Sequence, residues 1–114
     1  EVGDVVLLDN TKDTKTRREL HLAAAVHSEL TDYTEIKSLF DYFCRTLGIT
    51  EKITVKEAKV NGFIEGRTAE IFLGKEKLGV IGEIHPEILE NHKLDLPTAV
   101  FEINITPFFR EKIR

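Results

Sequence analysis

The 114-residue sequence contains no methionine, no tryptophan and a single cysteine, Cys44. One cysteine cannot form a disulfide within the chain, so we expect a reducing, cytoplasmic environment. Because translation starts with methionine, its absence predicts that Glu1 is an internal point of a longer protein. No apolar run approaches the ~20 residues that a transmembrane helix requires.

The sequence also lacks an excess of positive charge. Its 16 lysines and arginines are outnumbered by 20 aspartates and glutamates, which gives a formal net charge of −4. A general nucleic-acid-binding surface is normally basic, so this balance argues against one. With 41% apolar and 32% charged residues, the composition is that of an ordinary globular protein. We expect one domain over residues 1–114, a truncated part of a larger core.

The hydrophobic pattern predicts an α+β fold, in which an antiparallel β-sheet is flanked by helices. Strand-like patterns occupy residues 2–8, 20–26, 53–58, 69–73, 78–84 and 101–105. Residues 11–18 are polar and basic, and we expect a loop there. Gly74-Lys75-Glu76-Lys77 is typical of a hairpin turn between two of the strands.

Residues 31–48 are predicted to form an amphipathic helix. The apolar positions recur at three- and four-residue steps: Tyr33, Ile36, Leu39, Phe40, Phe43, Cys44 and Leu47. Asp32 is a plausible N-cap, and Gly48 stands where a left-handed residue closes a helix. We expect this helix to lie on the sheet. A shorter helix is predicted over residues 86–92, with Pro86 in its first turn.

The spacing of the histidines does not favour a metal-binding or catalytic site. His21 and His27 point the same way on one predicted strand but lie about 20 Å apart, so they cannot share a metal ion. His85 precedes Pro86 at a strand-to-helix corner, where its ring is able to make one hydrogen bond. His92 follows two helical turns later, without a carboxylate or thiol to complete a ligand set. The sequence predicts no metal site.

Three glutamates, Glu70, Glu83 and Glu102, lie on different predicted strands, and two of them could be neighbours in the sheet. Paired carboxylates can perform acid–base catalysis. Carboxylates that face lysine or arginine on a sheet are far more common, and we favour that interpretation. A small hydrolase that uses Glu83 and His85 is an alternative.

Gly79 and Gly82 lie inside a strand pattern, which indicates close approach of another backbone or a bulge. Arg67 ends a glycine-flanked loop predicted over residues 62–67. It could clamp a carboxylate or phosphate, but we favour a contact that ties this loop to its own sheet.

Cys44 has no nearby cation to lower the pKa of its thiol, so we expect a core residue.

The run Gly-Val-Ile-Gly-Glu-Ile-His-Pro-Glu-Ile-Leu at residues 79–89, followed by Phe-Glu-Ile-Asn at residues 101–104, resembles the C-terminal part of the phenylalanyl-tRNA synthetase beta subunit family. Segments that agree in order are residues 1–6, 32–37 and 62–71. The stretch at residues 17–24 is similar to archaeal and eukaryotic members.

The resemblance implies part of a class II aminoacyl-tRNA synthetase-like core that is catalytically silent. In the family, this module pairs with a catalytic alpha subunit in an α2β2 assembly, and the alpha subunit binds ATP, Mg²⁺ and phenylalanine and charges tRNA(Phe). We therefore expect no catalytic, cofactor or metal residue in this chain. Candidates for structural or interaction roles are Arg67, His85, Pro86 and Phe101. A stand-alone synthetase-like paralogue that binds a small metabolite is the alternative.

The residues of the last predicted strand are consistent with the absence of catalytic activity that the resemblance implies. The alpha subunits of the family carry a Gly-x-Gly-x-x-x-Arg pattern after a comparable helix, but no glycine occurs at residues 100–109. We expect Phe101, Ile103 and Asn104 to fill the space of a nucleotide and Glu102 to repel its phosphates. The predicted strand at residues 20–27 also lacks the arginine that class II enzymes use to grip an α-phosphate.

Overall fold

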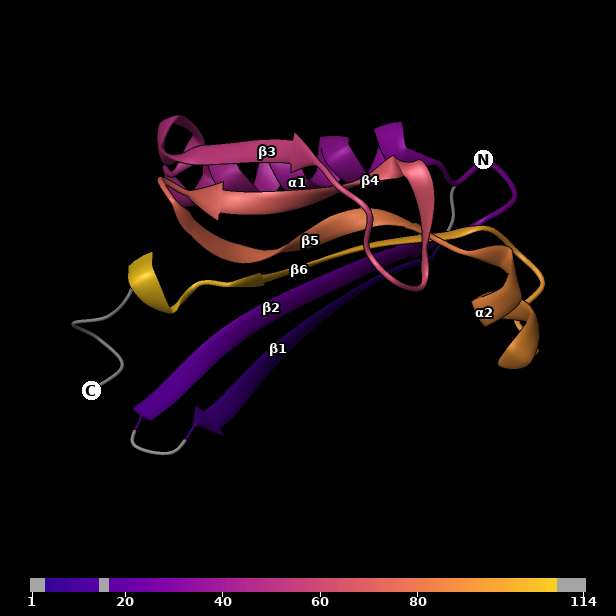
Figure 1. Ribbon diagram of the computed structural model, residues 1–114, viewed down its shortest axis with the longest axis horizontal. Helices are drawn as coiled ribbons and strands as arrows, with labels where there is room; N and C mark the ends of the chain where they lie inside the picture. Colours follow the sequence, from indigo (N-terminus) through magenta and orange to yellow (C-terminus); the bar gives the residue numbers. More distant parts are fainter. Residues whose placement is uncertain (1–3, 15–16, 109–114) are drawn as a thin grey trace.

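The computed structural model describes the backbone of residues 4–14 and 17–108 and the side chains of residues 19–108. Within these described residues, six antiparallel strands form one sheet in the order β1-β2-β6-β5-β4-β3 (Figure 1). The strands are β1 (Asp4–Thr14), β2 (Arg17–His27), β3 (Ile53–Glu57), β4 (Phe63–Leu73), β5 (Glu76–Ile84) and β6 (Thr98–Asn104). The predicted α+β fold class is confirmed.

One long helix, α1 (Tyr33–Leu47), packs on β5, β6 and β2. The Asp32 side chain accepts a hydrogen bond from the Glu35 amide at 2.9 Å, and Gly48 adopts a left-handed φ of 73°, so the predicted caps are confirmed. The short helix α2 (Pro86–Asn91) lies at one end of the sheet, and the 3₁₀ turns are η1 (Thr50–Lys52) and η2 (Thr106–Phe108). No helix among residues 4–14 and 17–108 is long and apolar enough to cross a membrane.

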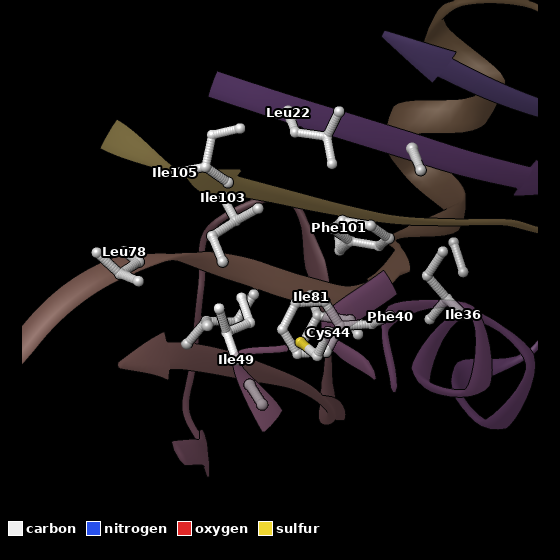
Figure 2. Close-up of a cluster of buried hydrophobic side chains, with 14 of the residues drawn as sticks. Leu22, Ile36, Phe40, Cys44, Ile49, Leu78, Ile81, Phe101, Ile103 and Ile105 are labelled. Atoms are coloured by element: carbon white, nitrogen blue, oxygen red, sulfur yellow. The ribbon is translucent and has the colours of Figure 1, made fainter. Parts of the chain in front are cut away.

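The hydrophobic core lies between the sheet and α1 (Figure 2). The rings of Phe40 and Phe101 meet edge to face, with their centroids 5.1 Å apart. Around them, Ile36, Ile81 and Ile103 have no exposed surface. Because burial of each large apolar side chain contributes about 1.5–3 kcal/mol, this layer fixes the position of α1 on the sheet.

Two predicted loops are wrong. Residues 11–18 were expected to form a loop, but β1 continues to Thr14, which pairs with Arg17 in a long hairpin. Backbone amides and carbonyls make the strand pairing, so a polar sequence alone does not exclude it. Residues 62–67 were also expected to form a loop, yet β4 begins at Phe63. Its pairing with β5 is irregular between Phe63 and Thr68, and this irregularity places glycine inside a strand.

The two strand glycines permit close backbone approach, as the sequence predicted. A Cβ atom on Gly79 would lie 1.8 Å from the carbonyl oxygen of Glu102 on the neighbouring strand β6. A Cβ atom on Gly82 would lie 2.9 Å from the carbonyl oxygen of Arg67 on β4. Both glycines therefore allow β5 to pack between its two neighbours.

Candidate functional site

The carboxylate of Glu83 in β5 joins the start of α1 to Arg67 in β4. Glu83 is only 7% exposed. The amide of Tyr33 donates to Oε2 at 2.8 Å, and Nη1 of Arg67 donates to Oε1 at 3.3 Å. The first amides of a helix have no partner within the helix, so an acceptor at this position is favourable. Both oxygens of Glu83 are therefore engaged in holding elements together.

Arg67 contacts this buried carboxylate from a solvent-exposed position. Its side chain is 61% exposed, so water and salt screen the ion pair. The contact runs from β4 to β5, which is the kind of tie to its own sheet that the sequence favoured. The functional role of Arg67 stays a prediction.

His85 and Pro86 form the start of α2. His85 is the N-cap, its Nδ1 atom accepts a hydrogen bond from the Glu87 amide at 3.1 Å, and Pro86 follows in the first turn. The His85 amide donates to the carbonyl oxygen of Gly62 at 2.9 Å. Glu83 and His85 thus have separate partners, and no hydrogen bond joins them within the described residues. The geometry gives no support to a catalytic Glu83–His85 pair.

Phe101 and Ile103 point into the core beneath the sheet, which corrects the expectation that they fill a nucleotide space together with Asn104. Phe101 is 1% exposed and packs against Phe40 and Phe43 of α1. Because side chains alternate along a strand, Glu102 and Asn104 point to the opposite face. The two sets cannot occupy one space.

The sheet face opposite α1 is called the open face, and its described residues include His21, Ala23, Ala25, Glu70, Val80, Val100, Glu102 and Asn104. On this face His21 approaches two carboxylates, with Nε2 3.1 Å from Oε1 of Glu19 and Nδ1 3.7 Å from Oε2 of Glu102. The carboxylate of Glu70 accepts from Nζ of Lys77 at 2.8 Å. Val80 lies between Glu70 and Glu102 in the sheet register, so the two glutamates are about 10 Å apart and form no carboxylate pair.

The described residues contain neither a reactive thiol nor a metal-ligand cluster. Cys44 is buried in the core, and burial, followed by the charge of Asp41, raises the pKa of its thiol to about 11. A thiol with such a pKa is protonated at neutral pH and is a poor nucleophile. No group of three or more histidine, cysteine, aspartate or glutamate side chains among residues 19–108 is placed to hold a metal ion.

A groove of about 620 Å³ runs between α1 and the edge of the sheet. It is called the α1–β3 groove and is lined by Tyr33, Lys37, Phe40, Asp41, Cys44, Thr50, Ile53, Thr54, Val55, Glu57, Gly66, Arg67, Thr68 and Ala69. The sequence did not predict this groove. The only available signal was the alternation of Ile53 and Val55 with polar residues in a short strand.

Comparison with known proteins identifies the family. Residues 1–105 match the family model described as the phenylalanyl tRNA synthetase beta chain CLM domain. The chain belongs to this family. The resemblance that residues 79–89 and 101–104 suggested is therefore confirmed.

This CLM domain is 40% identical over 110 residues to the phenylalanine-tRNA ligase beta subunit of Thermococcus sibiricus. It is 39% identical over 106 residues to the phenylalanine-tRNA ligase beta subunit of Saccharolobus solfataricus. The alignments cover 96% and 93% of this chain and 19% of each relative. The chain thus spans about a fifth of the length of the curated relatives that it matches.

Two solved structures of pyrrolysyl tRNA synthetases from Desulfitobacterium hafniense share the fold of this CLM domain. Their TM-scores are 0.67 and 0.71 at 14% and 9% sequence identity. The matches cover 96% and 99% of this chain and 42% and 43% of those chains. At such identities the likeness concerns the fold alone, and it confirms the predicted class II synthetase-like architecture.

Proposed function

We propose that this chain is a non-catalytic structural and interaction module of the beta subunit of a phenylalanine-tRNA ligase. In this proposal a catalytic alpha subunit binds ATP, Mg²⁺ and phenylalanine and attaches phenylalanine to tRNA(Phe). The module holds no cofactor and supports the alpha subunit within a cytoplasmic α2β2 assembly. The family match and the names of the relatives support the assignment to this ligase.

The proposal that the module is non-catalytic rests on the charge of the side chains on the open face. Across β2, β6, β5 and β4, one row of the register reads Ala23, Glu102, Val80 and Glu70. Two carboxylates in such a row disfavour the phosphates of a nucleotide, which cationic side chains and helix N-termini attract. Within residues 19–108 the arginines are Arg45 and Arg67. Arg45 belongs to α1, and Arg67 contacts the buried Glu83.

The first test uses Glu102→Gln in the intact ligase. If the open face takes no part in catalysis, the aminoacylation rate stays within about twofold of the wild-type rate, whereas loss of an acid–base group costs about 100-fold or more. The matched control is Phe101→Ala, one residue away but in the core, which is expected to lower the amount of assembled enzyme. A loss of about 100-fold with normal assembly for Glu102→Gln would refute the proposal.

The second test separates the module from the alternative of a stand-alone metabolite-binding paralogue. The isolated chain is titrated with ATP and Mg²⁺ while backbone amide signals are recorded. We expect no saturable change on the open face. A beta subunit from which residues 1–114 are deleted is then co-expressed with the alpha subunit, and we expect loss of both association and aminoacylation. Saturable nucleotide binding, or full activity of the deleted enzyme, contradicts the proposal.

A further inference from the structure

The α1–β3 groove lies on the opposite side of the sheet from the open face, and the proposed function leaves it without a role. Strand β3 stands at the end of the strand order and pairs only with β4 among the strands that the structure describes. One row of backbone amides and carbonyls in β3 therefore has no strand beside it. Such an edge is a template for the addition of another extended segment.

The inner side of this edge is apolar and incompletely covered. Ile53 and Val55 are half-buried and pack against the hydrophobic core, while Thr54, Lys56 and Glu57 are exposed. Across the groove, α1 contributes Tyr33, Phe40 and Cys44. The side chains of an added strand at alternate positions would enter the space between these two walls.

The dimensions of the groove suit an extended segment. The lining residues of α1 run from Tyr33 to Cys44, which corresponds to about 16 Å along the helix axis. The five residues of β3 span about 17 Å when extended. A strand of about five residues therefore matches the length of both walls.

The charges of the groove favour a cationic residue at one end. Nζ of Lys37 lies 2.9 Å from Oδ1 of Asp41, and Arg67 is paired with Glu83, so both cations have a matching carboxylate. Glu57 lines the same end, and within residues 19–108 its carboxylate makes no hydrogen bond or ion pair. Glu57 and Tyr33 both line the groove, where burial raises the pKa of the Tyr33 hydroxyl and the negative charge of Glu57 makes a smaller contribution in the same direction. The unmatched charge is negative, which disfavours an anionic ligand.

We propose that the α1–β3 groove binds an extended segment of a partner protein, which adds to β3 as a seventh strand of the sheet. The segment places apolar side chains at alternate positions against Ile53 and Val55. It places a lysine or arginine beside Glu57. Backbone pairing supplies affinity, and the alternating side chains supply specificity. This inference does not depend on the ligase assignment, because it concerns a different face of the sheet.

The test is a titration of the isotope-labelled chain with two blocked peptides, Arg-Thr-Val-Thr-Ile and Ile-Thr-Val-Thr-Arg. The first places arginine beside Glu57 in antiparallel pairing with β3, and the second does so in parallel pairing. We expect one of them to shift the amide signals of β3 and of the groove side of α1, with a Kd of about 1 mM or tighter. The amides at the free edge of β3 should also exchange more slowly with solvent. The control peptides carry N-methyl groups at alternate residues, which remove strand hydrogen bonds, and should not bind.

Two charge variants test the position of the cation. Glu57→Lys should weaken binding of the arginine peptide about two- to fivefold, the range of an exposed ion pair, and should strengthen binding of a peptide with glutamate in its place. Glu76→Lys makes the same charge change beside Leu73, at the far end of the β3–β4 ladder. This control should leave binding of both peptides unchanged.

Several results would overturn the proposal. The first is the absence of any amide signal shift when either peptide is present at several millimolar. The second is a set of shifts confined to the open face or to α2. The third is binding of the N-methylated peptides as tight as that of the unmethylated peptides. Equal effects of Glu57→Lys and Glu76→Lys also contradict it. Sedimentation that shows a dimer, with β3 amides protected in the absence of peptide, would assign the edge to a second copy of the chain and exclude the proposed occupant.

Discussion

Glu83→Ala tests how strongly one buried carboxylate joins α1, β4 and β5. The substitution leaves the Tyr33 amide at the start of α1 without its acceptor, which costs about 1–3 kcal/mol for a buried donor. It also removes the ion pair with Arg67, but that side chain is 61% exposed, so the pair adds about 1 kcal/mol at most. We therefore expect the free energy of unfolding to fall by about 2–3 kcal/mol, most of it from the lost amide bond.

Two matched variants separate the contributions. Glu83→Gln keeps an oxygen that accepts from the Tyr33 amide and removes only the charge, so it should cost about 1 kcal/mol or less. Arg67→Ala removes only the exposed partner and should cost a similar amount, since an exposed ion pair contributes about 0–1 kcal/mol. The measurement is urea unfolding followed by circular dichroism, with an unchanged dependence on urea concentration as the sign of an unchanged native fold.

The order of the three variants decides whether this account is correct. If Arg67→Ala destabilises the chain as much as Glu83→Ala, the ion pair and not the amide bond dominates. If Glu83→Gln is as costly as Glu83→Ala, the negative charge at the start of α1 is the main contribution. Either result refutes the reasoning from exposure.

Further substitutions test the core, the close strand packing and the buried thiol. Phe101→Ala should lower the free energy of unfolding by about 3–5 kcal/mol in the same urea experiment, because it removes a buried aromatic ring. Gly79→Ala should destabilise the chain far more than Gly74→Ala in thermal unfolding, because only the first places a Cβ atom 1.8 Å from the carbonyl oxygen of Glu102; equal shifts of Tm would contradict this packing. Burial raises the pKa of Cys44 from 9.0 to about 11, so the unfolded chain releases the thiol proton first and stability should decrease as the pH rises from 9 toward 11. Cys44→Ala should reduce this decrease, and an identical pH profile for the variant would show that another group causes it.

Local signals explain why α1 was predicted well from the sequence. Asp32 and Gly48 mark its two ends by their own side chain and backbone preferences, and the apolar stripe between them faces the sheet. The strand pattern predicted at residues 101–105 likewise places Phe101 and Ile103 on one face. It did not show that α1 covers this face, because the choice of face depends on contacts between distant elements.

Features that depend on contacts between residues distant in the chain could not be predicted from the sequence. Tyr33 and Glu83 are 50 positions apart, and nothing near either residue indicates their hydrogen bond. Gly66 has a left-handed φ of 86° inside β4, and the pairing of β4 with β5 is irregular between Phe63 and Thr68, so the local sequence of this glycine-flanked segment is typical of a loop. The α1–β3 groove arises where a helix and an edge strand pass each other, and no single stretch of sequence encodes that meeting.

The place of β6 in the sheet has a consequence for synthesis of the chain. It lies between β2 and β5, so it joins the β1–β2 ribbon to the ribbon of β3, β4 and β5. Because a ribosome delivers residues 98–104 after all the other described strands, β2 and β5 keep unpaired edges until that segment emerges. During this interval the nascent polypeptide is exposed to aggregation through those edges, and chaperone binding would protect it most until residues 98–104 have emerged from the ribosome.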